Sequence, residues 1–230
     1  MTTAPVNSPT YWDRTYEREL GEGRTRSHEH VWRLLLPHIT TYDLLVDVGC
    51  GTGDFLRWLR SQRPLLPLVG QDHSELAIRH AQKIEEVEGG AAGEIAVQPS
   101  PGMNREQRRA LAQNQAVAGK TKRLFISFVV ADAYRLLVPS NTAGYVYSGH
   151  LLEHLEDPVR ALREQHRILR RGGTVLVHFP HEDAPYVEHL HVLNFGKVMG
   201  WLEEAGFVVV GHSDVIPGQP TNDGFVWGTK

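Results

Sequence analysis

Three glycines occupy every second position of the run Gly49-Cys50-Gly51-Thr52-Gly53. The apolar stretch 44–48 precedes this run, and residues 54–61 after it carry apolar side chains at helical spacing. Glycines between a strand and a helix let the backbone turn sharply and let a ligand approach the main chain. A plain tight turn without a ligand is the alternative. We expect the turn to hold a nucleotide-like ligand.

The spacing around this turn narrows the choice of ligand. A dinucleotide site requires G-x-G-x-x-G, but the sixth position counted from Gly49 is Asp54 and that counted from Gly51 is Leu56. A phosphate-binding P-loop is also excluded, because no Gly-Lys-Ser/Thr follows. Asp47 and Asp54 would repel a pyrophosphate. These carboxylates favour a ligand that carries positive charge.

The run from Asp47 to Gly53 resembles motif I of the class I S-adenosylmethionine-dependent methyltransferases. Asp72 stands where that family places the acidic residue that binds the ribose, and Asp132-Ala133 stands where it meets the adenine. Three later motifs of the family have counterparts in the same order, at 148–155, 167–174 and 204–207. The resemblance implies S-adenosylmethionine as the cofactor. It also implies cofactor contacts from Asp47, Gly49, Cys50, Gly51, Gly53, Asp54, Asp72, His73, Asp132, Ala133 and Ser148.

Methyl transfer from a sulfonium is an in-line displacement, in which the enzyme mainly aligns the reacting atoms. A hydroxyl or amine acceptor must also lose a proton, and histidine is the usual base. His150 is our candidate, because residues after the fourth strand adjoin the methyl group in the family; shaping the pocket is its alternative role. For the acceptor we expect contacts from Tyr11 and Trp12 in the N-terminal arm and from His178 and His181 around the end of the fifth strand.

The chain has 13 histidines and a single cysteine, Cys50. Two alternating pairs, His28-x-His30 and His189-x-His191, would each lie on one face of a strand. No cysteine spacing typical of zinc sites accompanies them. We therefore expect no metal site.

Apolar runs alternate with segments of helical spacing, which predicts a doubly wound, Rossmann-like α/β fold. The resemblance implies seven strands, mostly parallel, with the last antiparallel. We expect Ser74, Asp157 and Asn194 to begin helices, and Gly172-Gly173 to end one before a strand at 174–179. The expected strands are 44–48, 65–70, 124–130, 144–147, 174–179, 207–211 and 225–228. A helical arm at 1–40 would cover the site on a domain at 41–230, and Gly/Pro punctuation marks an insertion at about 88–121, with a helix near 103–117.

The composition and two missing sequence features argue against several classes of function. The 230 residues include 24 Lys and Arg against 27 Asp and Glu, and this net charge of −3 disfavours a nucleic-acid binder. The motif after the fourth strand also lacks the Asn/Asp-Pro-Pro-Tyr/Phe tetrad of enzymes that methylate amino groups of DNA. No apolar run is long enough to span a membrane, and a cytoplasmic location is the default. We therefore expect an enzyme that methylates oxygen or nitrogen of a small molecule.

The sequence leaves two alternatives to this function. They are a catalytically silent cofactor-binding module that acts through a partner, and a nicotinamide-dependent oxidoreductase. The oligomeric state is not predicted.

Overall fold

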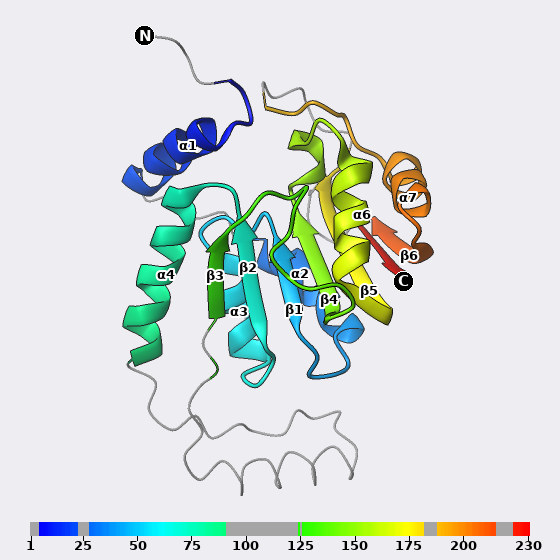
Figure 1. Ribbon diagram of the computed structural model, residues 1–230, viewed down its shortest axis with the longest axis horizontal. Coiled ribbons are helices and arrows are strands. Elements are labelled where there is room, and N and C mark those ends of the chain that lie inside the picture. Colours follow the sequence, from blue (N-terminus) through cyan, green and yellow to red (C-terminus); the bar gives the residue numbers. More distant parts are fainter. Residues whose placement is uncertain (1–4, 23–27, 91–123, 125, 182–187, 215–222) are drawn as a thin grey trace, which may run out of the picture.

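A seven-stranded sheet forms the centre of the computed structural model, which describes residues 5–22, 28–90, 124, 126–181, 188–214 and 223–230. The strand order is β3-β2-β1-β4-β5-β7-β6 (Figure 1). The strands are β1 (Leu45–Val48), β2 (Leu68–Asp72), β3 (Ile126–Val130), β4 (Ala143–Gly149), β5 (Leu169–Pro180), β6 (Val208–Asp214) and β7 (Asp223–Thr229). The helices are α1 (Pro9–Gly21), α2 (Glu29–Leu35), η1 (Leu36–His38), α3 (Asp54–Gln62), α4 (Glu75–Gly90), η2 (Leu152–His154), α6 (Pro158–Ile168) and α7 (Phe195–Glu204).

The first five strands are parallel, and β7 lies antiparallel between β5 and β6. This topology confirms the predicted fold class. The strand order reverses between β1 and β4, and ligands of open α/β sheets bind at the carboxyl ends of the strands beside such a reversal. The fold therefore places the candidate residues after β1, β2, β3 and β4 at one edge of the sheet.

The sheet is buried on both faces, which explains why its strands read as nearly continuous apolar runs. Leu45 packs with α2, α3 and α4 on one face, whereas Val46 and Val48 pack with α6 and α7 on the other. Neighbouring strands alternate in the same way. Tyr145 and Tyr147 of β4 pack on the same face of the sheet as Leu45. Two apolar layers thus hold the strand ends in a fixed arrangement.

Side-chain caps begin the helices where the sequence predicts them. Asp157 accepts a hydrogen bond from the backbone of Arg160, Asn194 accepts one from Lys197, and the hydroxyl of Ser74 accepts one from Ala77.

The prediction for the Gly172-Gly173 pair was wrong. α6 already ends at Ile168, and the pair lies within β5, which begins at Leu169. Both glycines exchange backbone hydrogen bonds with Lys230, so the last residue of the chain extends the pairing with β7 at this end of β5.

Helix α1 of the predicted arm lies beyond the carboxyl ends of the strands, near the top of Figure 1. Asp13 anchors α1 there, because its carboxylate accepts hydrogen bonds from the hydroxyl of Ser74 and the backbone of Leu76 at the start of α4.

The predicted insertion begins inside α4, which continues to Gly90. Residues 91–123, with the helix expected near 103–117, lie outside the described residues. In the described part of the chain no helix is long and apolar enough to cross a membrane.

Candidate active site

A cavity of about 460 Å³ opens at the carboxyl ends of β1, β2, β3 and β4, under the N-terminal arm. Its volume lies within the range of small-molecule sites. Twelve of the sixteen residues that the sequence predicts for the site line this cavity. They are Trp12, Asp47, Gly49, Cys50, Gly51, Asp54, Asp72, His73, Asp132, Ala133, His150 and His178.

The glycine turn requires its glycines. Gly49, Gly51 and Gly53 all have positive φ angles, of 79°, 51° and 84°. A Cβ atom on Gly51 would lie 2.7 Å from the hydroxyl oxygen of Tyr16. The backbone N–H groups of Gly49 and Cys50 donate to the carbonyl of Gln71 at the end of β2, which fixes the turn against the neighbouring strand.

Asp72 links the glycine turn to the end of β2. One carboxylate oxygen accepts a hydrogen bond from the N–H of Gly51 at 2.9 Å, and the other accepts one from the N–H of Ser74 at 2.9 Å. Burial raises the pKa of Asp72, and these hydrogen bonds offset only part of that rise. The pKa of Asp47 is raised well above its ordinary value by burial and then by the charge of Asp72. Two carboxyl groups are therefore held together where a cation would stabilise their charged forms.

The lining of the cavity is acidic. Among the described residues that line it there is no lysine or arginine. Six acidic residues do so: Glu19, Asp47, Asp54, Asp72, Asp132 and Glu156. Thr52 and Arg57 hydrogen-bond the Asp54 carboxylate, which leaves Asp47 and Asp72 as the buried acidic pair. Such a wall favours a cationic ligand and repels phosphate groups.

Aromatic rings complete the wall, and Trp12 is the only one of them among the predicted site residues. Trp32 of α2 and Phe55 of α3 lie 5.7 Å apart between ring centroids, and Phe55 lies 4.1 Å from Tyr147 of β4. Trp12 and Tyr16 approach from α1. In the sequence, Phe55 and Tyr147 are indistinguishable from core residues, because the alternation that predicts burial does not mark which buried rings border a cavity.

Four predicted site residues are not among those that line the cavity. Gly53 is part of the turn but faces Phe128, and Ser148 is buried within β4. Tyr11 packs edge-on against Trp12, and His181 contacts the rings of Phe179 and Phe195. Their roles toward cofactor and acceptor stay predictions.

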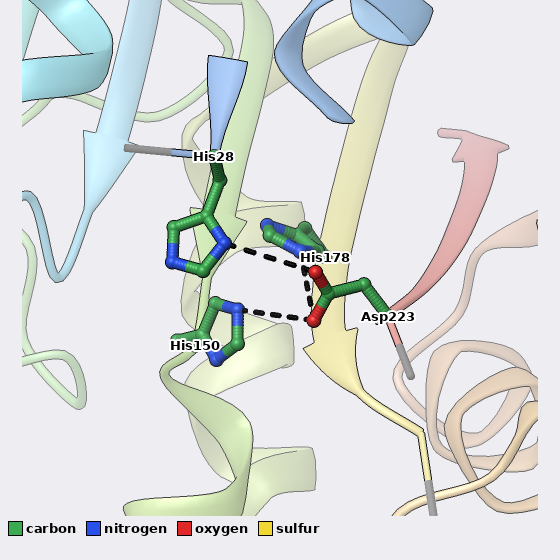
Figure 2. Close-up of side chains that lie close together, drawn as sticks. All are labelled: His28, His150, His178 and Asp223. Carbon is green, nitrogen blue, oxygen red and sulfur yellow. Dashed lines mark ion pairs between the residues drawn. The ribbon is translucent and has the colours of Figure 1, made fainter. Parts of the chain in front are cut away.

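Three histidines that line the cavity surround the carboxylate of Asp223 (Figure 2), and Nε2 of a fourth, His30, lies 3.9 Å from the same carboxylate. His28 precedes α2, His150 follows β4, His178 lies in β5, and Asp223 begins β7. His150 Nε2 lies 3.5 Å from an oxygen of Asp223, and His178 Nε2 lies 3.6 Å from the same oxygen. His28 Nδ1 lies 3.7 Å from the other oxygen. In the sequence, His28 stands out only as part of an alternating pair, and no local pattern marks Asp223.

The two buried histidines differ in charge. Burial alone would lower the pKa of His150, but the carboxylates of Asp223 and Glu153 raise it to about 9, so the ring carries a proton at neutral pH. Burial and the charge of His150 lower the pKa of His178 to about 4, so that ring is neutral. Although burial opposes it, contact with the histidines lowers the pKa of Asp223 below its ordinary value. A general base must be unprotonated before it can accept a proton, and His150 is protonated at neutral pH. Its role as a general base stays a prediction.

The chain is similar to known methyltransferases. The model of the Methyltransferase domain family matches residues 12–212. The uncharacterized methyltransferase C1B3.06c of Schizosaccharomyces pombe is 28% identical over 153 residues, 64% of this chain and 45% of that protein. The probable S-adenosylmethionine-dependent methyltransferase Rv3030 of Mycobacterium tuberculosis is 24% identical over 209 residues, 86% of this chain and 60% of that protein. The chain thus spans about half the length of these relatives.

A solved structure shows the same fold. The chain superimposes with a TM-score of 0.65 on a structure of the Haloferax volcanii complex between the Trm112 methyltransferase activator and a putative methyltransferase, at 17% identity and with 95% of each chain covered. The match to the family model, the sheet order and the glycine turn agree with one another. This chain belongs to the class I S-adenosylmethionine-dependent methyltransferases, within the Methyltransferase domain family.

Proposed function

We propose that this protein transfers the methyl group of S-adenosylmethionine to an oxygen or nitrogen atom of a small molecule. The observation that supports this most directly is the acidic cavity at the glycine turn, in which Asp47 and Asp72 are buried together. S-adenosylmethionine carries a positive sulfonium and a positive amino group, which suit such a wall. The nicotinamide alternative fits poorly, because a dinucleotide would bring a negative pyrophosphate to the same carboxylates.

The proposed placement of the cofactor follows the resemblance residue by residue. Asp72 would accept hydrogen bonds from the ribose hydroxyls with the lone pairs that Gly51 and Ser74 leave free. Asp132 and Ala133, which line the cavity after β3, would lie beside the adenine. The methionine part of the cofactor would then run past the glycine turn toward the end of β4.

We propose an acceptor that is small and either neutral or cationic. Trp12 and Tyr16 of the arm line the cavity, whose volume of about 460 Å³ is that of a small-molecule site. The absence of lysine and arginine from its described lining removes the usual contacts to nucleic-acid phosphates. Aromatic rings and carboxylates are suited to binding a ring system or an amine.

In the proposed reaction an oxygen or nitrogen lone pair of the acceptor forms a bond to the methyl carbon. The carbon–sulfur bond breaks, its electron pair stays on sulfur, and the proton that the acceptor loses passes to solvent. His150 directs Nε2 at Asp223 and Nδ1 at Glu153, 3.4 Å away, so neither nitrogen is open in the way that a free base requires. We therefore propose that His150 acts as part of the group formed with His28, His178 and Asp223.

Two measurements on the full chain test the function. Calorimetry with S-adenosylmethionine and with NAD separates the two cofactor classes: binding of NAD alone would refute the proposal. A panel of hydroxyl- and amine-bearing small molecules, followed by the formation of S-adenosylhomocysteine, then separates an enzyme from a silent binding module. Turnover that is unchanged in His150→Ala would remove His150 from the reaction.

A further inference from the structure

We propose that His28, His150, His178 and Asp223 form a binding site for one divalent transition-metal ion of the zinc class. These residues come from four separate segments of the chain, and their side chains point toward one another (Figure 2). One ligand atom from each lies within 4.8 Å of the ligand atoms of the other three. This revises the expectation, drawn from the sequence, that there is no metal site.

The distances in this cluster suit coordination better than direct hydrogen bonding. The three histidine nitrogens lie 3.5, 3.6 and 3.7 Å from the oxygens of Asp223. Hydrogen bonds between nitrogen and oxygen rarely exceed about 3.2 Å. Ligand atoms around a tetrahedral ion with bonds of about 2.0–2.1 Å lie about 3.3–3.4 Å apart. The nitrogen–oxygen distances are thus close to those around an ion, and the four ligand atoms, which lie within 4.8 Å of one another, would draw together on binding it.

Two of the three histidine nitrogens of the cluster that face Asp223 lack a hydrogen-bond partner. The Nε2 atoms of His150 and His178 are both buried and make no hydrogen bond within the described structure. A buried polar atom without a hydrogen-bond partner destabilises the folded state. A metal ion between these nitrogens and the carboxylate would remove that destabilisation at two positions at once.

Groups behind the histidines are placed to orient them for a metal. His150 Nδ1 lies 3.4 Å from the fully buried carboxylate of Glu153, and His178 Nδ1 lies 3.2 Å from the hydroxyl of Tyr147. Histidines that bind metals usually donate their second N–H to a carboxylate or another oxygen, which leaves the first nitrogen unprotonated for the ion. His178 has that arrangement, His150 directs Nδ1 toward Glu153 at the longer distance of an ion pair, and both rings turn Nε2 toward the centre.

The ligand set selects the kind of ion. Three imidazoles and one carboxylate suit zinc and its neighbours in the first transition row, whereas magnesium and calcium prefer oxygen ligands. His28, His150 and His178 also line the cavity, so the ion would lie in its wall. If the proposed methyl transfer is correct, on which this step rests, the acceptor is a molecule whose hydroxyl or amine can enter the ion's coordination sphere as a fifth ligand.

A second group of possible ligands lies nearby and is the rival site. Glu153, His154 and His189 also have ligand atoms within 4.8 Å of one another. This group offers only two nitrogens and one oxygen, and Glu153 already faces His150. We expect the ion in the first group, and His189→Ala is the matched control because it removes a histidine from the second group alone.

The test uses the full chain, stripped of metal with a chelator and then titrated with Co²⁺ and with Zn²⁺. We expect one ion per chain, visible absorption bands typical of Co²⁺ bound by nitrogen and oxygen in a tetrahedral site, and a higher melting temperature with Zn²⁺. These readouts do not involve methyl transfer, so they fail independently of the proposed function. A wild-type chain that binds neither ion would overturn the proposal.

Variants then locate the ion. Loss of an outer partner of a metal ligand weakens binding about 10–100-fold, so Asp223→Asn and His178→Asn should each weaken Zn²⁺ binding by more than about 100-fold. His189→Ala should bind as the wild type does. Two variants on different strands guard against a folding defect in one, and binding of S-adenosylmethionine checks that each is folded. Normal binding in both ligand variants, or loss in His189→Ala alone, would refute the assignment.

Discussion

The change Asp72→Asn should weaken binding of S-adenosylmethionine strongly while the protein stays folded. The substitution keeps the shape of the side chain but removes the charge that would receive the ribose hydroxyls. Hydrogen bonds to charged groups contribute about 1.5–3 kcal/mol, and each 1.4 kcal/mol is a tenfold change in affinity, so the dissociation constant should rise about ten- to a hundredfold.

The folded state should change less, because two effects oppose each other. An amide nitrogen facing the N–H of Gly51 or Ser74 leaves one buried donor unpaired. The same substitution removes the burial cost of a charge and its repulsion with Asp47. We therefore expect a melting temperature within a few degrees of the wild type.

Isothermal titration calorimetry measures the affinity, and thermal unfolding measures the stability. The matched control is Asp43→Asn, the same chemical change at a half-exposed carboxylate that pairs with Arg170 away from the cavity. Its affinity for the cofactor should equal that of the wild type. A folded Asp72→Asn protein with an affinity within about twofold of the wild type would refute the placement of the ribose at Asp72.

Two further predictions concern the same turn. Burial raises the pKa of Asp47 and Asp72 in the free protein, and a cation beside them favours their charged forms, so cofactor binding at mildly acidic pH should release protons. The observed binding enthalpy should then change with the ionisation enthalpy of the buffer; no change would contradict a cationic ligand there. Gly51→Ala should cost about 1 kcal/mol or more of stability and weaken cofactor binding, because its φ is 51° and the new Cβ meets Tyr16. Gly200→Ala, in open space on α7, should do neither, and equal effects in a urea titration would speak against the turn.

The sequence was sufficient for the sheet because each strand has a local signature. Leu45–Val48 and Ile126–Val130 are apolar runs ended by a turn or an acidic residue, and both form strands. The end of α6 was misplaced because glycine commonly ends helices, while here β5 starts at Leu169 and includes Gly172. What decides this boundary is pairing with the last residues of the chain, which no local pattern contains.

The meeting of the candidate cofactor residues at one end of the sheet could be predicted for the same reason. Asp47, Gly51 and Asp72 lie at strand ends whose order in the sheet follows from the fold class, so their meeting follows from topology. The aromatic wall and the histidine cluster depend instead on which buried side chains face a gap. Trp32 is an example: it occupies a core position of α2, yet it also borders the cavity.

The direction of β7 explains why Asp223 escaped prediction. In a parallel strand the last residue lies at the carboxyl edge of the sheet, where the site is. Because β7 is antiparallel, its first residue lies there, opposite Pro180 at the end of β5. His178 pairs with Phe225, so His178 and Asp223 are diagonal neighbours on one face of the sheet, the face that also carries Tyr147 and α2. The antiparallel strand therefore supplies the cluster's only carboxylate, and a fully parallel sheet would have placed that residue at the opposite edge.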